Sequence, residues 1–462
     1  MPAKLCVQVM VNKHKNNPME NVVDAKKILD QSPMHGFQIM AVTLCILLNA
    51  LDGFDVLAIS FASPGIAAEW SINRAALGIV LAMELVGMAI GSIILGGMAD
   101  KYGRRPTILF CLVLMTIGMY LASLVGSVNQ LLIVRFITGL GIGGMLASTN
   151  AMVAEFANAK FRNLAVILMA TGYPIGAIVG GSISTVLLQQ YDWRAIFVFG
   201  AAVTFAFLFI VWFLLPESIE FLQRKQPGDA LQRINKTLAK MGHQALPGLP
   251  PKAEPNSAAK SSYHTLFSPQ YRSLTVLMVV SYFSLIMTFY FILKWIPKIV
   301  VDMGYEPSSA GSVLVWANIG GATGSILLGL IASKFRLRKL LMGTLVAGFA
   351  MVTVFGMGQS SLGGLATIAA MTGFFTNASV VGFYALIANA FPADVRGSGT
   401  GIVIGIGRGG AALGPILAGF LFTAGFNLQT VSVVMGAGAL VAAAALVFLG
   451  PVLKRHKLPS SI

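Results

Sequence analysis

Long apolar segments alternate with short polar ones along almost the whole chain. Twelve of the apolar segments are long enough to cross the hydrocarbon core of a bilayer, which takes about 20 helical residues. They lie at roughly 37–62, 75–99, 107–126, 129–154, 163–188, 195–215, 273–297, 310–333, 340–358, 362–390, 398–422 and 428–450. This pattern predicts an all-α integral membrane protein with 12 transmembrane helices.

The longest polar break, at 216–272, divides the twelve segments into six and six. It carries several basic residues and then a proline-rich stretch, which predicts a short amphipathic helix followed by a linker. The expected organisation is a cytoplasmic N-terminal tail (1–36), a six-helix bundle (37–215), a cytoplasmic central loop (216–272), a second six-helix bundle (273–450) and a cytoplasmic C-terminal tail (451–462).

Two sequence matches relate the halves to each other. The segment Gly96–Arg105 after the second apolar segment is similar to Gly329–Arg338 after the eighth. A second set of matches, at nearly the same spacing along the chain, pairs Arg162, Gly176 and Gly180 with Arg396, Gly410 and Gly414. Repeats of this kind place a binding site at their interface near the middle of the membrane. We therefore expect two pseudo-symmetric bundles with the functional site between them.

Composition and charge agree with this interpretation. Apolar residues make up 56% of the chain and charged residues 11%, whereas soluble proteins have about 25% charged residues. The net charge of +15 does not indicate nucleic-acid binding, because of the 32 Lys and Arg residues only Arg74, Arg194 and Lys298 lie in the loops on one side. By the positive-inside rule, both termini are expected in the cytoplasm.

The sequence favours neither an enzyme nor a cofactor or metal site. Cys6, Cys45 and Cys111 are too few and too scattered for a disulfide framework or a zinc site. The motifs H-E-x-x-H, G-x-S-x-G and the GK[ST] of a Walker sequence are absent. Without a nucleotide-binding domain, an ion gradient is the expected source of energy.

Three motifs resemble those of the major facilitator superfamily, over about residues 37–450. Gly96–Arg105 is similar to the family signature G-x-L-A-D-r-x-G-R-R, with Met98 in place of Leu. Arg135, followed by Thr138 and Gly139, resembles the helix-four signature, and Pro216–Ser218 resembles the usual end of helix six. The copy in the second half is degraded. The resemblance implies the major facilitator fold and alternating access between its two bundles.

A shorter set of motifs resembles the aromatic acid:proton symporters within that superfamily. Asp52–Asp55 reads D-G-F-D in the first apolar segment, where those proteins have D-G-x-D, and the run Pro392–Gly397 and Arg408–Gly410 also look like that family. The resemblance implies proton-coupled import of benzoate-like or hydroxybenzoate-like acids at a bacterial inner membrane. Proton symporters of dicarboxylates, shikimate or muconate share much of this pattern, and an exporter or a membrane receptor for aromatic acids are further alternatives.

Asp52 and Asp55 are the candidates for proton coupling. Three residues apart on one helix, they share a face, and two carboxylates that close in a low-dielectric cavity resist ionising together. One of them is expected to hold a proton at neutral pH. No histidine lies well inside an apolar segment to take this role. The alternative is a structural hydrogen bond from Asp52 to a neighbouring helix.

Arg408 and Arg135 are the candidate cations of the site. Arg408 lies near the middle of its segment among glycines, and its guanidinium can bind a substrate carboxylate bidentately. Arg135 and Asp55 lie at similar depth and are expected to be able to pair, which would link a proton to the substrate. A purely structural clamp between helices is the alternative for each arginine.

Other residues complete the set of candidates. Lys294, near the outer end of its segment, is expected to extend toward the lipid headgroups. Substrate contacts are expected from Tyr384, Asn318 and Tyr290, with Glu84, Tyr173 and Asn377 as further cavity residues. Gating roles between the two halves are expected for Asp100, Arg104, Arg105 and Arg396. The expected partners are a small organic acid, protons and the lipid bilayer, with no nucleic acid, and the protein is expected to be a monomer.

Overall fold

The computed structural model describes residues 25–250, 265–332, 334–391 and 395–455, and every regular element in these ranges is a helix. The helices are α1 (Ala25–Gln31), α2 (Gly36–Trp70), α3 (Arg74–Tyr102), α4 (Arg104–Ala122), α5 (Val128–Phe156), α6 (Arg162–Gln190), α7 (Arg194–Leu214), α8 (Ile219–Lys225), α9 (Ala230–Lys240), α11 (Arg272–Asp302), α12 (Pro307–Ile331), α13 (Leu337–Gly356), α14 (Leu362–Ala390), α15 (Arg396–Thr423) and α16 (Leu428–Arg455).

Twelve of the described helices, α2–α7 and α11–α16, are long and apolar enough to span a membrane. This confirms the predicted fold class. The central loop differs from the prediction in holding two short helices, α8 and α9, rather than one.

The first span is longer than the sequence pattern predicts. The pattern ends at residue 62 because Ser63 and Pro64 follow, but α2 continues to Trp70. Pro64 has no N–H to donate to the carbonyl of Ser60, four residues earlier. The Ser63 hydroxyl donates to that carbonyl instead, at 2.8 Å. The helix therefore continues past Pro64, and the buried Ser60 carbonyl still has a hydrogen-bond donor.

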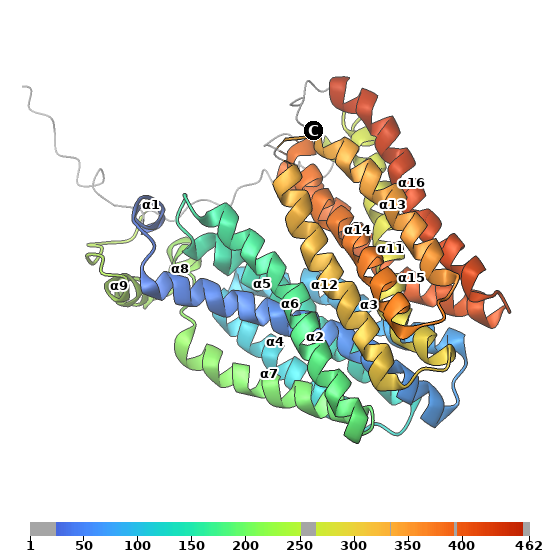
Figure 1. Ribbon diagram of the computed structural model, residues 1–462. Coiled ribbons are helices and arrows are strands. Elements are labelled where there is room, and N and C mark those ends of the chain that lie inside the picture. The colour runs from blue at the N-terminus through green and yellow to red at the C-terminus, as the bar shows by residue number, and fades with distance from the viewer. Residues whose placement is uncertain (1–24, 251–264, 333, 392–394, 456–462) are drawn as a thin grey trace, which may run out of the picture.

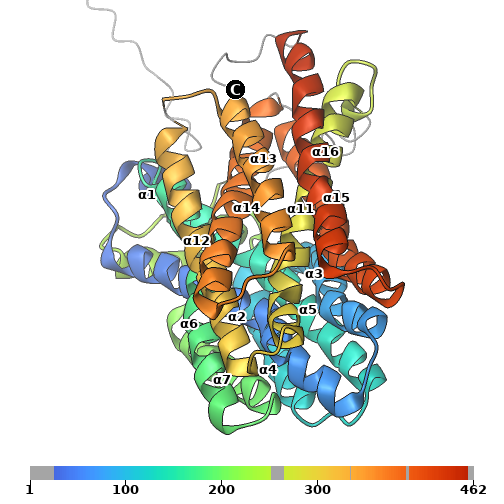
Figure 2. The same ribbon diagram turned by 45° about the vertical axis from the view of Figure 1, so that its right-hand side comes forward.

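The spans form two bundles with related packing. Figures 1 and 2 show α2–α7, in blue to green, beside α11–α16, in yellow to red. Gly176 of α6 lies directly against the backbone of Ala50 in α2, and its sequence match Gly410 of α15 lies directly against Phe283 in α11. A side chain at either glycine would collide with backbone. The repeat therefore carries the same helix contact in each half, although the exact domain boundaries stay a prediction.

The two bundles touch at one end and diverge at the other. We call the end that holds α8, α9 and the start of α2 the tail end, and the opposite one the far end. At the far end a Cβ on Gly78 of α3 would lie 2.6 Å from the carbonyl oxygen of Pro415 in α15, and one on Gly419 would lie 2.5 Å from that of Arg74. Toward the tail end of α15, Gly401 and Gly405 have no such neighbour within 4 Å in the ranges that the structure describes. The bundles are therefore closed at the far end and open toward the tail end (Figure 1).

Candidate functional site

The site begins with Asp52 and Asp55 on α2. Their exposed fractions are 2% and 0%. None of their four carboxylate oxygens has a hydrogen-bond partner among the described residues. Gly53 between them lies directly against the backbone of Tyr173 in α6, so α2 is held too tightly at this depth to turn the carboxylates away. A buried carboxylate without partners is costly when charged, and it is well suited to hold a proton.

Arg135 of α5 meets a different acid from the one predicted. Its guanidinium forms an ion pair with Glu84 of α3, and both side chains are fully buried. It also donates to the backbone carbonyl of Asp55 at 3.0 Å. The pairing follows from helix contact, because Gly139 lets α5 lie directly against the backbone of Glu84. Arg135 remains within electrostatic reach of the Asp55 carboxylate.

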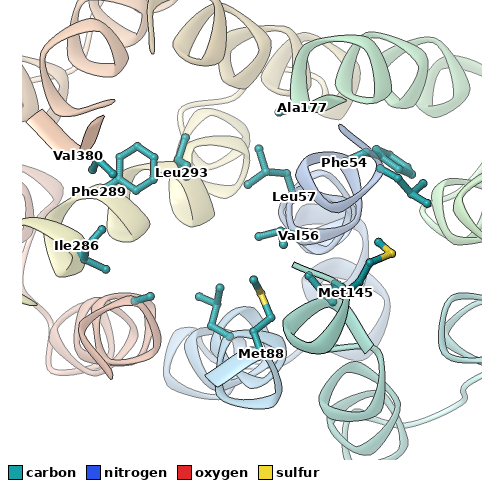
Figure 3. Packing of buried hydrophobic residues seen from close by; sticks show 14 of the residues in the cluster. Phe54, Val56, Leu57, Met88, Met145, Ala177, Ile286, Phe289, Leu293 and Val380 are labelled. Carbon is teal, nitrogen blue, oxygen red and sulfur yellow. The ribbon is translucent and has the colours of Figure 1, made fainter. Parts of the chain in front are cut away.

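The prediction that Lys294 of α11 extends to the lipid headgroups is wrong. Its side chain is fully buried, with the ammonium 3.7 Å from the Glu84 carboxylate. It also donates to the backbone carbonyl of Val56 in α2. Figure 3 shows the neighbouring Leu293 of α11 opposite Leu57 of α2, so this stretch of α11 faces the first bundle rather than lipid. Position near a helix end does not show which way the side chain faces.

Arg408 of α15 lies at the interface between the bundles. It is half-buried. Its guanidinium donates to the backbone carbonyl of Met88 in α3 at 3.4 Å, a long hydrogen bond. The arginine is also within electrostatic reach of Asp52 across the interface. Most of its donor capacity is therefore open to a carboxylate ligand, with a titratable acid nearby.

Tyrosines surround this arginine. Tyr282 of α11 and Tyr384 of α14 have their hydroxyls 3.2 Å apart, and Tyr384 is 42% exposed. Tyr290 interacts electrostatically with Arg408 and with Tyr173 from the other bundle. Sequence reasoning missed Tyr282. Gly407 was the feature of the sequence that could have indicated it, because the Tyr282 ring fills the space that a side chain at Gly407 would take.

The two asparagines have structural partners. Asn318 donates to the carbonyl of Leu314 in its own helix at 2.9 Å, and only 5% of it is exposed. Asn377 of α14 donates to the Ser325 hydroxyl of α12 at 3.0 Å, which is a bond between two helices. A role for either residue in binding substrate stays a prediction.

The predicted gating residues of the first half form a network within that half. Arg104 pairs with Asp100 at 2.9 Å and with Glu155 of α5 at 3.2 Å. Asp100 also pairs with Arg224 of α8 at 3.1 Å. Arg105 donates to the carbonyl of Trp212 in α7 at 2.6 Å. These contacts all lie within the first bundle, as expected where the bundles are apart.

Glu217 is a tail-end residue that sequence reasoning did not single out. One of its carboxylate oxygens accepts hydrogen bonds from the backbone N–H groups of Arg104, Arg105 and Ser218 at 2.9, 3.2 and 2.9 Å. Burial raises the pKa of Glu217 above its ordinary value of 4.5, while these hydrogen bonds act in the opposite direction. The motif Pro216–Ser218 was recognised, but only as the end of a helix.

Arg396 of the second half donates to the carbonyl of Phe391 at 3.3 Å. The adjoining Pro392, Ala393 and Asp394 lie outside the described residues. No group of three metal-ligating side chains occurs in the part of the chain that the structure describes. Two surface pockets lie away from the charge cluster, one at the far end beside Arg74 and one at the tail end beside Lys26.

Comparisons with known proteins agree with this architecture. The family described as Major Facilitator Superfamily matches residues 45–335 and 278–461. A gallate transporter of Pseudomonas putida is 28% identical over 94% of this chain and 96% of its own length. The 4-hydroxybenzoate transporter PcaK of the same species is 30% identical over 95% and 97%. A benzoate transport protein of Acinetobacter baylyi is 29% identical over 88% of each chain.

Solved structures share the fold. The inward open conformation of the xylose transporter XylE from Escherichia coli matches with a TM-score of 0.70 and 17% identity, covering 90% of this chain and 96% of that one. A structure titled D-xylose-proton symporter matches with a TM-score of 0.69, also at 17% identity, covering 92% and 99%. At such low identity, the likeness supports the arrangement of helices alone.

Proposed function

Because the chain belongs to the Major Facilitator Superfamily, we propose that it is a proton-coupled secondary transporter that imports an aromatic carboxylic acid by alternating access. The observation that carries this proposal is the pair Asp52 and Asp55, buried near a half-buried arginine at the bundle interface with no hydrogen-bond partner in the described part of the chain. Such a site can hold an anion and a proton together. The relatives named for gallate, 4-hydroxybenzoate and benzoate support an aromatic acid.

Arg408 is the proposed ligand of the substrate carboxylate. Its planar guanidinium matches a carboxylate with two parallel hydrogen bonds, and its one long bond to Met88 is easily given up. Tyr282, Tyr290 and Tyr384 offer rings for stacking and hydroxyls for a polar substituent. The ligand would thus be held by its charge at one end and by aromatic contact along its ring.

Asp52 and Asp55 are the proposed proton carriers. Asp52 lies near Arg408, and Asp55 lies near Arg135. A substrate anion that occupies Arg408 removes the compensating charge beside Asp52, which favours protonation of that carboxylate. An acid anion that travels with one proton moves no net charge, so the pH gradient alone would drive it. The tail end, with both termini, is proposed to face the cytoplasm of a bacterial inner membrane.

A non-aromatic organic acid is the second candidate substrate. Arg408 and the two aspartates could bind muconate, shikimate or a dicarboxylate equally well, since a contact with the carboxylate does not distinguish an aromatic from a non-aromatic acid. The tyrosines favour the aromatic acid. Nothing in the described site distinguishes export or a receptor function from import, so both stay alternatives.

The test is uptake of radiolabelled 4-hydroxybenzoate and benzoate into proteoliposomes under an imposed inward proton gradient. We expect gradient-dependent uptake by the wild type and its loss in Asp55→Asn. Arg408→Lys keeps the charge but loses the bidentate fork, so its KM should rise about tenfold, as a loss of about 1.4 kcal/mol implies. Asp192→Asn, an exposed carboxylate at the far end, is the matched control and should transport normally.

Two outcomes would contradict the proposal in different ways. Uptake by the wild type that ignores the proton gradient would exclude proton coupling. Uptake of muconate or shikimate, with neither aromatic acid carried, would exclude the aromatic substrate and leave the coupling mechanism intact.

A further inference from the structure

The Lys294 ammonium has an unusual set of partners. Lys294 belongs to the second bundle, but its ammonium contacts the Glu84 carboxylate and the Val56 carbonyl, which both belong to the first. Lys294 and Glu84 are fully buried. If the bundles separated at this depth, the ammonium would lose both contacts at once.

Glu84 is shared between the bundles. It binds Arg135 from its own bundle and Lys294 from the other, so one buried carboxylate neutralises part of the charge of two buried cations. The exposed cross-bundle pair at the same end, Arg74 with Asp302 at 2.9 Å, is in contact with solvent and should contribute little to closure.

The two cations differ in what they could bind without Glu84. Arg135 has the Asp55 carbonyl at 3.0 Å and lies near the Asp55 carboxylate, both within its own bundle. Lys294 has Glu84 as its one neighbouring carboxylate in the described part of the chain, and would keep only the Val56 carbonyl. Removing the Glu84 charge would therefore leave Lys294 as an uncompensated buried cation at the bundle interface, which is strongly unfavourable.

We infer that Glu84 is a positioning residue of the transport cycle, whose carboxylate allows the far end to close by neutralising the Lys294 ammonium at the bundle interface. When the far end opens, Lys294 leaves Glu84 and is solvated by entering water, while Arg135 stays with Glu84. The acid is therefore never left unpaired. This role does not depend on which acid is carried or on proton coupling.

The inference predicts an asymmetry between the two partners. Glu84→Gln removes the carboxylate that neutralises the Lys294 ammonium. The far end should then open, because opening lets water reach the ammonium. Lys294→Met leaves Glu84 paired with Arg135 and places an apolar side chain in an apolar interface, so the far end should stay closed. The double variant Glu84→Gln/Lys294→Met should also stay closed, because the orphaned cation is gone.

Spin-label distances can measure this directly in the full-length protein. One label pair, at Gln190 and Gln429, spans the bundles at the far end, and a second, at Lys225 and Lys339, spans them at the tail end. All four positions are exposed. A Cys6→Ser background restricts labelling to the introduced cysteines, because Cys45 and Cys111 are buried. Arg74→Met, which removes the exposed cross-bundle pair, is the matched control.

We expect Glu84→Gln to shift the main far-end distance to longer values and the tail-end distance to shorter ones. Lys294→Met, the double variant and Arg74→Met should keep the wild-type far-end distance. Unchanged distances in Glu84→Gln, or a double variant as open as Glu84→Gln, would overturn the inference. If Glu84→Gln does not yield folded protein, the double variant must do so, and its failure to fold would equally overturn it. If the wild type takes up neither aromatic acid while all the distances are as expected, this inference stands and the result counts against the proposed function alone.

Discussion

Glu217 holds together the junction of α3, α4 and α8 with one carboxylate oxygen. Three backbone N–H groups converge on it, two of them from the start of α4. The N–H groups in the first turn of a helix have no partner within the helix, and a buried acceptor satisfies them. Gly103 (φ 118°) makes the tight link between α3 and α4, and its open face is occupied by the same Glu217 carboxylate.

Glu217 should make the stability of this junction depend on pH. Burial raises its pKa above 4.5, so the native state binds the proton more tightly than the unfolded chain does. The protonated Glu217 carboxyl therefore makes its whole stabilising contribution to the free energy of unfolding below pH 4.5. This contribution is lost as the pH rises through the raised pKa. Melting temperatures in detergent, measured from pH 4.5 to 7.5, should therefore rise for Glu217→Gln relative to the wild type as the pH increases.

Glu217→Ala is the companion variant. It leaves three N–H groups without an acceptor, and each buried unsatisfied group costs about 1–3 kcal/mol. Its melting temperature should fall at every pH. If the melting temperatures of the wild type and Glu217→Gln change in parallel with pH, the raised pKa of Glu217 is contradicted.

At the residue scale, the sequence identified which charged side chains are buried better than it identified their partners. Asp52, Asp55, Glu84 and Arg135 were all expected inside spans, and the structure buries them all. The pairing of Arg135 with Glu84 was missed, because depth along a helix says nothing of the direction in which a side chain leaves it. That direction depends on helix rotation, which close glycine contacts such as that of Gly139 decide.

At the element scale, α15 shows how one helix face serves the contact between bundles. Gly419 and Gly401 lie 18 residues apart, which is five turns, so they share a face. Gly419 lies against α3 at the closed far end, with the Cα atoms of Gly78 and Ala75 only 3.2 and 3.3 Å from its Cβ position. Gly401 faces open space near the tail end.

Gly419→Val should therefore force α3 and α15 apart at the far end. The backbone atoms opposite cannot move away cheaply, so the far-end spin-label distance between Gln190 and Gln429 should lengthen. Gly401→Val makes the same substitution on the same face where there is room, and should leave that distance unchanged. An equal effect of both variants would show that valine acts through helix stability rather than through the contact.

Helix boundaries were predictable to the extent that local sequence sets them. Asn73 and Ser127 accept hydrogen bonds from the first turns of α3 and α5, and both follow polar breaks that the pattern located. The end of α2 was misplaced because Pro64 reads as a stop signal, whereas the Ser63 hydroxyl compensates for the missing donor. The signal for this was a serine directly before the proline.

At the scale of the whole molecule, the distribution of basic residues predicts the orientation in the membrane. The tail end carries most of the Lys and Arg residues, so it should lie in the cytoplasm. A green fluorescent protein fused after Ile462 should then be fluorescent, and an alkaline phosphatase fused there should be inactive. Active phosphatase would place the tail end outside and reverse the direction in which the present conformation opens.

The sequence predicted two related bundles but could not predict which end is open. The matches between the halves describe contacts within each bundle, such as those of Gly176 and Gly410, and these persist however the bundles tilt. The contacts that select a conformation, including Lys294 with Glu84, join residues more than 200 positions apart and depend on the tilt itself.

The glycines on the open half of α15 have a consequence for the conformation that this structure does not show. Among the described residues, no atom lies near the Cβ positions of Gly397, Gly401 and Gly405, yet each glycine within a helix costs about 1 kcal/mol relative to alanine. The far half of the same helix uses its glycines for backbone contact. We expect the tail half to use its own in the same way once the tail end closes, so that α15 carries two docking surfaces of which only one is occupied at a time.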